Sequence, residues 1–60
     1  LEYADGILMA AGCRIYVYDM NGRLLASGFD SIDTSALAPG VYAASARLAD
    51  GQQTTLKFAR

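Results

Sequence analysis

Turn-forming residues cut this sequence into short pieces, and their spacing limits the folds open to it. Glycine stands at positions 6, 12, 22, 28, 40 and 51, and the single proline is at position 39. The segments between these positions have the length of β-strands, which is typical of a sandwich or a barrel. No segment shows the repeat at three and four residues that marks an amphipathic helix. The sequence therefore predicts an all-β fold.

Five segments are predicted to be strands, and tight turns between consecutive strands favour antiparallel pairing. Residues 41–48 are rich in alanine, the best helix former. Their side chains nevertheless alternate, and the Pro39-Gly40 pair before them favours a turn over a helix start. Leu1–Tyr3 is a candidate for a further strand. The five strands are Ile7–Ala10, Arg14–Asp19, Arg23–Ser27, Val41–Leu48 and Gln53–Ala59. We expect residues 1–60 to form one small antiparallel β domain, either a sandwich or a barrel.

The stretch IYVYDMNGRLLASG, residues 15–28, predicts a β-hairpin, and two turns fit it. A two-residue loop of Asn21-Gly22 would form a type I′ turn. A three-residue loop, Met20–Gly22, would form a type I turn followed by a bulge, with its glycine in the left-handed region. Asp19 would then stand at the first turn position, where its carboxylate accepts a local backbone N–H.

The pairing of apolar residues separates these two turns, because a slip of one residue sends a strand's apolar set to the wrong face. The two-residue loop opposes Val17 to Ala26. The three-residue loop opposes Val17 to Leu25. It also opposes Tyr18 to Leu24, so both faces of the hairpin receive a large apolar pair. We therefore favour the three-residue loop.

The second half of the chain repeats this turn once and also contains a long excursion. Asp50-Gly51 predicts a similar turn between the last two strands, with Leu48 and Phe58 facing the core from either side of it. The excursion is FDSIDTSALAPG, residues 29–40, and it ends in Ala38-Pro39-Gly40, which would form a type II turn.

Within this excursion, a single helical turn is expected. Asp33, Thr34 and Ser35 are residue types that cap such a turn through their side chains. Ile32 and Leu37 flank them and would pack into the core. This interpretation gives Asp33 a structural role as the cap of the turn.

Size and composition restrict the function classes. A 60-residue chain buries only about 60% of its unfolded surface and is marginally stable by size alone. One cysteine and no histidine exclude an internal disulfide and an ordinary zinc site, and no cofactor or metal is expected. The net charge of −1 and the isoelectric point near 4.9 offer no electrostatic footprint for nucleic acid or an anionic membrane. No apolar run is long enough to span a bilayer. The chain shows no basic region followed by an apolar one, so we expect it to carry no secretory signal of its own. Because the chain begins at Leu1, we expect it to be a piece of a longer protein.

No catalytic residues are expected. Asp19, Asp33 and Asp50 all have turn or cap explanations. Ser35 lies in no nucleophile-elbow pattern and has no histidine partner. Cys13 opens an alternating strand, where a free cysteine is usually a small buried apolar residue. An enzyme is therefore the least supported class.

Two tyrosines on one strand face form a second candidate site. Tyr16 and Tyr18 are two positions apart, so they project from the same side of their strand and could stack on sugars or bases. Because the sequence shows little positive charge beside them, packing against a neighbouring strand or the parent protein is the favoured interpretation.

Three stretches of the sequence resemble one protein family. Residues 15–25, IYVYDMNGRLL, look like the V-x-I-Y-D-x-x-G-(K/R)-x-V block of the C-terminal sorting domains of type IX secretion cargo. Residues 32–42, IDTSALAPGVY, resemble the family's I-D-(L/I)-S-x-L-x-x-G-(V/I)-Y block. The closing LKFAR, residues 56–60, is similar to its terminus of a lysine, two hydrophobic residues and a lysine or arginine. The three motifs occur in the family's order and cover most of the chain.

The resemblance assigns roles to individual positions. The motif residues that it implies for the fold are Asp19, Gly22, Ser35, Leu37, Gly40 and Tyr42. The residues that it implies for recognition by the translocon are Lys57, Phe58, Ala59 and Arg60. Two positions depart from the family. Thr34 replaces an aliphatic residue and could loosen the core turn, while Ala59 is smaller than the usual β-branched residue.

The resemblance implies an immunoglobulin-like β-sandwich appended to proteins exported by Bacteroidetes-type bacteria. The parent would enter the periplasm through its own N-terminal signal, and the outer-membrane type IX machinery would recognise this domain. In many family members a surface sortase removes the domain and joins the mature protein to a surface lipopolysaccharide. The parent is then found at the cell surface.

A mechanism for recognition follows from the residues of the tail. Gln53–Arg60 would be the last strand and a sheet edge, with backbone groups free for strand addition by a receptor. Lys57 and Arg60 would steer the partner, and Phe58 would either fill the core or anchor in a partner pocket. We expect that deleting the last few residues abolishes export while the rest still folds.

Two other classes of function are compatible with the sequence. The chain could be a passive immunoglobulin- or fibronectin-like spacer, or a carbohydrate-binding module beside a secreted enzyme. A homodimer made by edge-strand pairing or strand exchange is also open to short sheets with free edges.

Overall fold

The computed structural model describes residues 1–48 and 50–60, and its regular structure is almost entirely β. Each of its strand pairs is antiparallel, so the all-β, antiparallel prediction is confirmed. The candidate strand at the N-terminus is also present, one residue later than predicted. The elements are β1 (Glu2–Ala4), β2 (Ile7–Tyr18), β3 (Leu24–Asp33), the 3₁₀ turn η1 (Thr34–Ala36), β4 (Val41–Arg47) and β5 (Gln53–Ala59).

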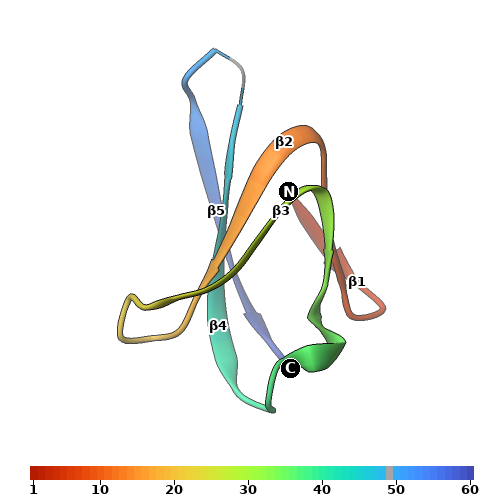
Figure 1. The fold of residues 1–60 in the computed structure, drawn as a ribbon, viewed down its shortest axis with the longest axis vertical. Helices are drawn as coiled ribbons and strands as arrows, with labels where there is room; N and C mark the ends of the chain where they lie inside the picture. Colours follow the sequence, from red (N-terminus) through yellow and green to blue (C-terminus); the bar gives the residue numbers. More distant parts are fainter. Residues whose placement is uncertain (49) are drawn as a thin grey trace.

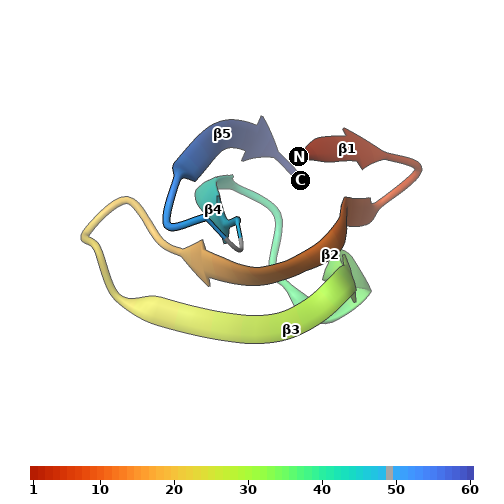
Figure 2. The same ribbon diagram turned by 90° about the horizontal axis from the view of Figure 1, so that it is seen from above.

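β2 is the central strand of one five-stranded sheet (Figure 1). One edge of β2 pairs with β3 along its length. The other edge pairs first with β1 and then with β4, and β5 lies beyond β4. Figure 2 shows that the sheet curls, so that β1 and β5 lie on the opposite side of the molecule from β3.

β2 spans two of the predicted strands because Gly12 bends the strand instead of ending it. Ala10 pairs with Asp30 and Arg14 pairs with Phe29, so the residues of β2 between them bulge out of the ladder. Gly12 has a φ of +73°, which glycine adopts without strain, and its N–H donates to Asp30 Oδ1 at 2.8 Å. The prediction of two separate strands was wrong for this reason. The bend allows one strand to pair with β1 and β4 in turn.

β3 is longer than predicted. It continues to Asp33, whereas the predicted strand ended at Ser27. Its second half pairs with the first half of β2, so the segment treated as irregular is in part a strand. The partner of these residues is distant in sequence, and turn-forming residue types alone did not reveal it.

The turn between β2 and β3 has the three-residue loop. Gly22 N donates to Asp19 O, and Asp19 N donates to Arg23 O, both at 3.0 Å. Gly22 has a φ of +83°. The Asp19 carboxylate accepts from the backbone N–H groups of Asn21 and Arg23, both at 2.9 Å. The predicted turn and the role of Asp19 are confirmed.

The register beyond this turn differs from the prediction. Tyr18 pairs with Leu24 as expected, but Val17 pairs with Ala26 and not with Leu25. Leu25 is the extra residue of a bulge and is 41% exposed. The bulge keeps the larger side chain off the inner face, where the small Ala26 lies opposite the buried Val17.

The curled sheet encloses a small core on its inner face. Leu8, Ile15 and Val17 of β2 are fully buried, and Tyr42 of β4 and Phe58 of β5 close over them. The other buried apolar residues are Ala10, Cys13, Ala44 and Ala46. The burial of Cys13 agrees with its predicted role as a small apolar residue.

Leu48 does not face the core as predicted. It is 38% exposed, whereas Phe58 is 6% exposed. Leu48 lies in the hairpin of β4 and β5, which extends above the rest of the sheet in Figure 1. The turn at Asp50-Gly51 is confirmed, because Gly51 N donates to Leu48 O at 3.0 Å and the Asp50 carboxylate accepts from Gln52 N at 3.0 Å.

η1 is the predicted capped turn. The Asp33 carboxylate accepts from Ser35 N at 2.9 Å. Thr34 is completely buried; its Oγ1 donates to Gly6 O at 2.7 Å, and its N–H donates to the same oxygen at 2.9 Å. Thr34 therefore ties η1 to the turn between β1 and β2. Two half-buried residues beside η1 pack against the core as predicted, Ile32 and Leu37.

The predicted type II turn at Ala38-Pro39-Gly40 is wrong. Such a turn needs a φ near +80° at its third residue, but Gly40 has a φ of +156°. Gly40 instead extends the ladder of β4 and β5: its N–H donates to Arg60 O at 3.2 Å, and Arg60 N donates to Gly40 O at 2.7 Å. The Ala38 carbonyl accepts from the Tyr42 hydroxyl at 2.5 Å.

We expect Gly22→Ala to destabilise the domain by about 1 kcal/mol, because the alanine must adopt a left-handed backbone. No atom lies close enough to clash with the added methyl group, so the cost measures backbone strain alone. Gly22→Asn should cost less, since asparagine tolerates this conformation. Urea denaturation of the three proteins checks the order, and equal stability of the alanine variant and the wild type would contradict it.

Candidate functional site

β5 is an edge strand, as predicted, and its backbone offers a row of free groups. It pairs with β4 and with no other strand among the described residues. Gly40 and Arg60 exchange both of their backbone hydrogen bonds, and such pairs alternate along an antiparallel ladder. The backbone groups that point to the free edge are therefore those of Gln53, Thr55, Lys57 and Ala59.

Phe58 fills the core and does not project toward a partner. Its ring lies 4.6 Å from that of Tyr3 and 5.7 Å from that of Tyr42, measured between ring centroids. These distances are typical of aromatic pairs that contribute beyond their buried area. Of the two roles open to Phe58 from the sequence, the structure selects the first. The other three tail residues, Lys57, Ala59 and Arg60, are exposed.

The end of the chain is attached to the domain by backbone and side chain together. The backbone of Arg60 pairs with Gly40, and its Nη2 donates to Ser35 O at 3.2 Å. Arg60 therefore joins β5 to η1. The end of β5 is therefore held in place up to Arg60.

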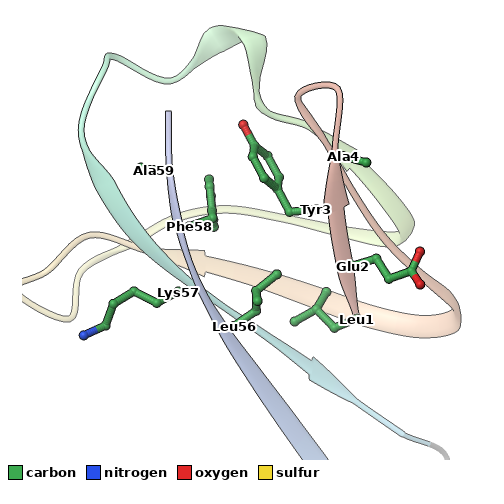
Figure 3. A pocket seen from close by; sticks show the side chains of 8 residues that line it. All are labelled: Leu1, Glu2, Tyr3, Ala4, Leu56, Lys57, Phe58 and Ala59. Carbon is green, nitrogen blue, oxygen red and sulfur yellow. The ribbon is translucent and has the colours of Figure 1, made fainter.

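An apolar groove of about 530 Å³ lies between the free edge of β5 and β1. Figure 3 shows Leu1 and Leu56 directed toward each other, with Tyr3 against Phe58 farther along. Lys57 points away from the groove on one side, and Glu2 points away on the other. In Figure 1 the two strands run in roughly the same direction, so a third strand between them could lie antiparallel to both.

The motif residues fall into two groups. Asp19 and Gly22 lie in the turn between β2 and β3, far in the fold from the end of the chain (Figure 1). Three of the other four contact the end of β5, since Gly40 pairs with Arg60, the Ser35 carbonyl accepts from Arg60 and Tyr42 packs on Phe58. The fourth, Leu37, packs against the core. The structure thus brings the second motif and the terminal motif together.

Sequence reasoning missed two contributors to this region. Tyr3 packs on Phe58, and its hydroxyl lies 3.4 Å from Thr34 Oγ1. Leu1 lines the groove. In the sequence, only the apolar character of Leu1 and the aromatic ring of Tyr3 could have indicated this role. The curl of the sheet then places both residues beside β5.

The electrostatics of the site centre on Asp33. The hydrogen bond from the Ser35 backbone N–H is the main cause that lowers the pKa of Asp33 below its ordinary value of 3.8. A hydrogen bond with the Ser35 side chain lowers it further, desolvation opposes these two effects, and the positive charge of Arg60 makes the smallest contribution, also downward. Hydrogen bonds to the charged form act in this direction. Asp33 is therefore an ionised cap at neutral pH.

The candidate site consists of the free edge of β5 and the apolar groove beside it. Residues 1–48 and 50–60 contain no cluster of three or more acidic, histidine or cysteine side chains that could hold a metal ion. No helix in these ranges is long and apolar enough to cross a membrane.

No protein-family model matches the chain, and searches of curated proteins and of solved structures found no match.

We expect Phe58→Ala to cost about 3–5 kcal/mol, because it removes a ring buried between two others. Lys57→Ala, at the neighbouring exposed position, should change stability by about 0.5 kcal/mol or less. Chemical denaturation of both variants tests the alternation of burial along β5. Similar losses for the two variants would contradict the assignment of Phe58 to the core.

The Asp33 cap predicts a dependence of stability on pH. Because its folded pKa is depressed, the stability that Asp33 contributes is present above the unfolded pKa and is lost as pH falls through the folded value. The stability difference between wild type and Asp33→Asn should therefore shrink as pH falls below 3.8. Ser35→Ala keeps the backbone donor and should retain most of this pH dependence. A difference that is constant with pH would exclude the proposed role of the carboxylate.

Proposed function

We propose that this chain is a folded C-terminal sorting domain that carries its parent protein across the outer membrane through the type IX secretion machinery. The observation that carries the proposal is the free edge of β5, which ends in the family-like terminal motif. In this view the parent passes through the periplasm and arrives at the cell surface, where a sortase removes the domain. The side chains transform no substrate.

Recognition would proceed by strand addition to β5. Backbone groups of Thr55 and Lys57 point to the free edge and can pair with an extended segment of the receptor. The groove beside this edge offers Leu1 and Leu56 as apolar contacts for side chains of the incoming strand. The exposed Lys57 and Arg60 would orient the partner by charge.

The immunoglobulin-like interpretation of the fold rests on one further contact. Tyr42 stands near the start of β4, and its hydroxyl donates to the carbonyl of Ala38, four residues earlier. A tyrosine that bonds back to the chain in this way is a hallmark of immunoglobulin-like sandwiches. We therefore interpret the curled sheet as a reduced sandwich whose two layers share the bent strands β2 and β3.

The structure changes the expected effect of truncation. Deleting the last few residues would remove Phe58 from between Tyr3 and Tyr42. In a domain that is marginally stable by size, such a loss would unfold the rest of the chain. A truncated domain that fails in export would then say nothing about recognition. The test must alter the edge of β5 and leave the core intact.

Thr55→Pro meets this requirement. The N–H of Thr55 points to the free edge, so proline removes a donor for the receptor while the ladder with β4 keeps its bonds. Fused to the C-terminus of a periplasmic reporter in a type IX-competent strain, this variant should leave the reporter in the periplasm. Thr55→Ala keeps the N–H and should export normally.

Circular dichroism of the purified domains shows whether both variants fold. Surface display of the proline variant at the wild-type level would refute recognition through the β5 edge. Equal display of the wild-type fusion in a strain without the translocon would refute the sorting function itself, and would favour a passive spacer. Sedimentation of the purified domain at several protein concentrations tests for a homodimer formed through the same edge. A mass that rises with concentration would indicate the homodimer, and a constant monomer mass would leave the edge free for a receptor.

A further inference from the structure

The outer face of the sheet carries rows of side chains that the sorting function does not use. Ile15 and Ala46 are fully buried on the inner face, so their neighbours in β2 and β4 project outward. One outward row crosses the strands in the order Phe29, Arg14, Arg47, Gln53. The next row is Ser27, Tyr16, Ser45, Thr55, and the third is Leu24, Tyr18, Ala43, Lys57.

Charge on this face is of one sign. Arg14 and Arg47 are direct neighbours across β2 and β4, and Lys57 lies on the same face of β5. None of the six acidic residues occupies these rows. They lie on β1, in turns, on β3 after Phe29 and opposite the β2 bulge, and at the cap of η1, and they are Glu2, Asp5, Asp19, Asp30, Asp33 and Asp50. The net charge of −1 therefore hides a segregated positive face.

Aromatic rings adjoin these cations. Phe29 pairs directly with Arg14 across β2 and β3, and it is 61% exposed. Tyr16 follows Arg14 on the same face and is half-buried. Like charges directly opposite each other are unfavourable in a sheet. The exposed ring of Phe29 would gain free energy if its apolar surface were removed from water. A ligand with negative charge and an apolar surface would reduce the repulsion between Arg14 and Arg47 and would cover the ring of Phe29.

We propose that this face binds an acidic polysaccharide, that is, a chain of sugar rings bearing carboxylate groups. Arg14 and Arg47 would hold the carboxylates through charge-assisted hydrogen bonds, which are strongest with arginine. Phe29 and Tyr16 would stack on the apolar faces of the rings. The hydroxyl groups of Ser27 and Thr55, both exposed, lie in the next row and can bond to sugar hydroxyls.

Charge density separates this ligand from a nucleic acid. A nucleic acid presents closely spaced phosphates and is bound by surfaces with many cations. Here three cations share a face in a domain of isoelectric point near 4.9, which suits a polymer with more widely spaced charges. The sequence by itself shows little positive charge beside Tyr16 and Tyr18. Arg14 lies two residues before Tyr16 on the same face of β2, and the register places Arg47 of β4 beside Arg14.

Binding of the 60-residue chain to polygalacturonate, measured by isothermal titration calorimetry, tests the proposal. We expect binding that weakens with added salt and no binding to neutral dextran. Arg14→Gln and Arg47→Gln should each weaken binding by about fivefold, and the double variant by about twentyfold. Arg23→Gln changes the net charge equally from a position outside the three rows and should weaken binding by less than about twofold.

The aromatic contribution has its own matched pair. Phe29→Ser should weaken binding by about fivefold. Met20→Ser removes a side chain of similar exposure, 56%, from the β2–β3 turn and should leave binding unchanged. Circular dichroism checks that each variant folds.

Three results would overturn the proposal. An effect of Arg23→Gln equal to that of Arg14→Gln would mean that binding reflects net charge and not this face. Tighter binding to a thymidine oligonucleotide than to polygalacturonate would assign the face to single-stranded nucleic acid. No binding of polygalacturonate at low salt would remove the carbohydrate ligand altogether.

Discussion

The packing of Phe58 between Tyr3 and Tyr42 holds the two ends of this small sheet together. These rings belong to β5, β1 and β4, and two of these strands, β1 and β5, share no ladder. Backbone pairing alone would leave the sheet open between β1 and β5, since both are edge strands. The aromatic cluster closes this side without consuming the hydrogen bonds of either edge. The groove exists because side chains, and not backbone, join the two strands.

This division would let β5 serve stability and the proposed recognition at once. Side chains that alternate along the strand bury Phe58 and expose Lys57, while the backbone groups alternate between the β4 ladder and the free edge. The four residues of the terminal motif, Lys57–Arg60, therefore need not be disordered for a partner to bind them. Arg60 reinforces this state, because its backbone and guanidinium bond to Gly40 and Ser35. An ordered edge spares a receptor the entropy of ordering a loose tail.

The proposed polysaccharide face and the proposed sorting edge occupy different surfaces of one sheet. The first uses side chains that project outward from β2, β3, β4 and β5, and the second uses the backbone of β5 in the plane of the sheet. Thr55 and Lys57 are common to both, since their side chains are on the outer face and their backbone groups are on the edge. Such a layout would allow an exported domain to contact a surface glycan after its edge has been released by the secretion machinery.

Local chemistry in the sequence determined the all-β class, the three-residue loop at Asp19–Gly22, the turn at Asp50-Gly51 and the cap at Asp33. These features depend on hydrogen bonds between residues a few positions apart, so residue type and spacing suffice to predict them. Only the tertiary structure decided the continuity of β2, the bulge at Leu25 and the exposure of Leu48, because pairing partners far along the chain control them. For the same reason, the burial of Phe58 against Tyr3 and the pairing of Arg14 with Arg47 followed from the curl and register of the sheet. Composition reported a nearly neutral chain, and the fold separated its charges.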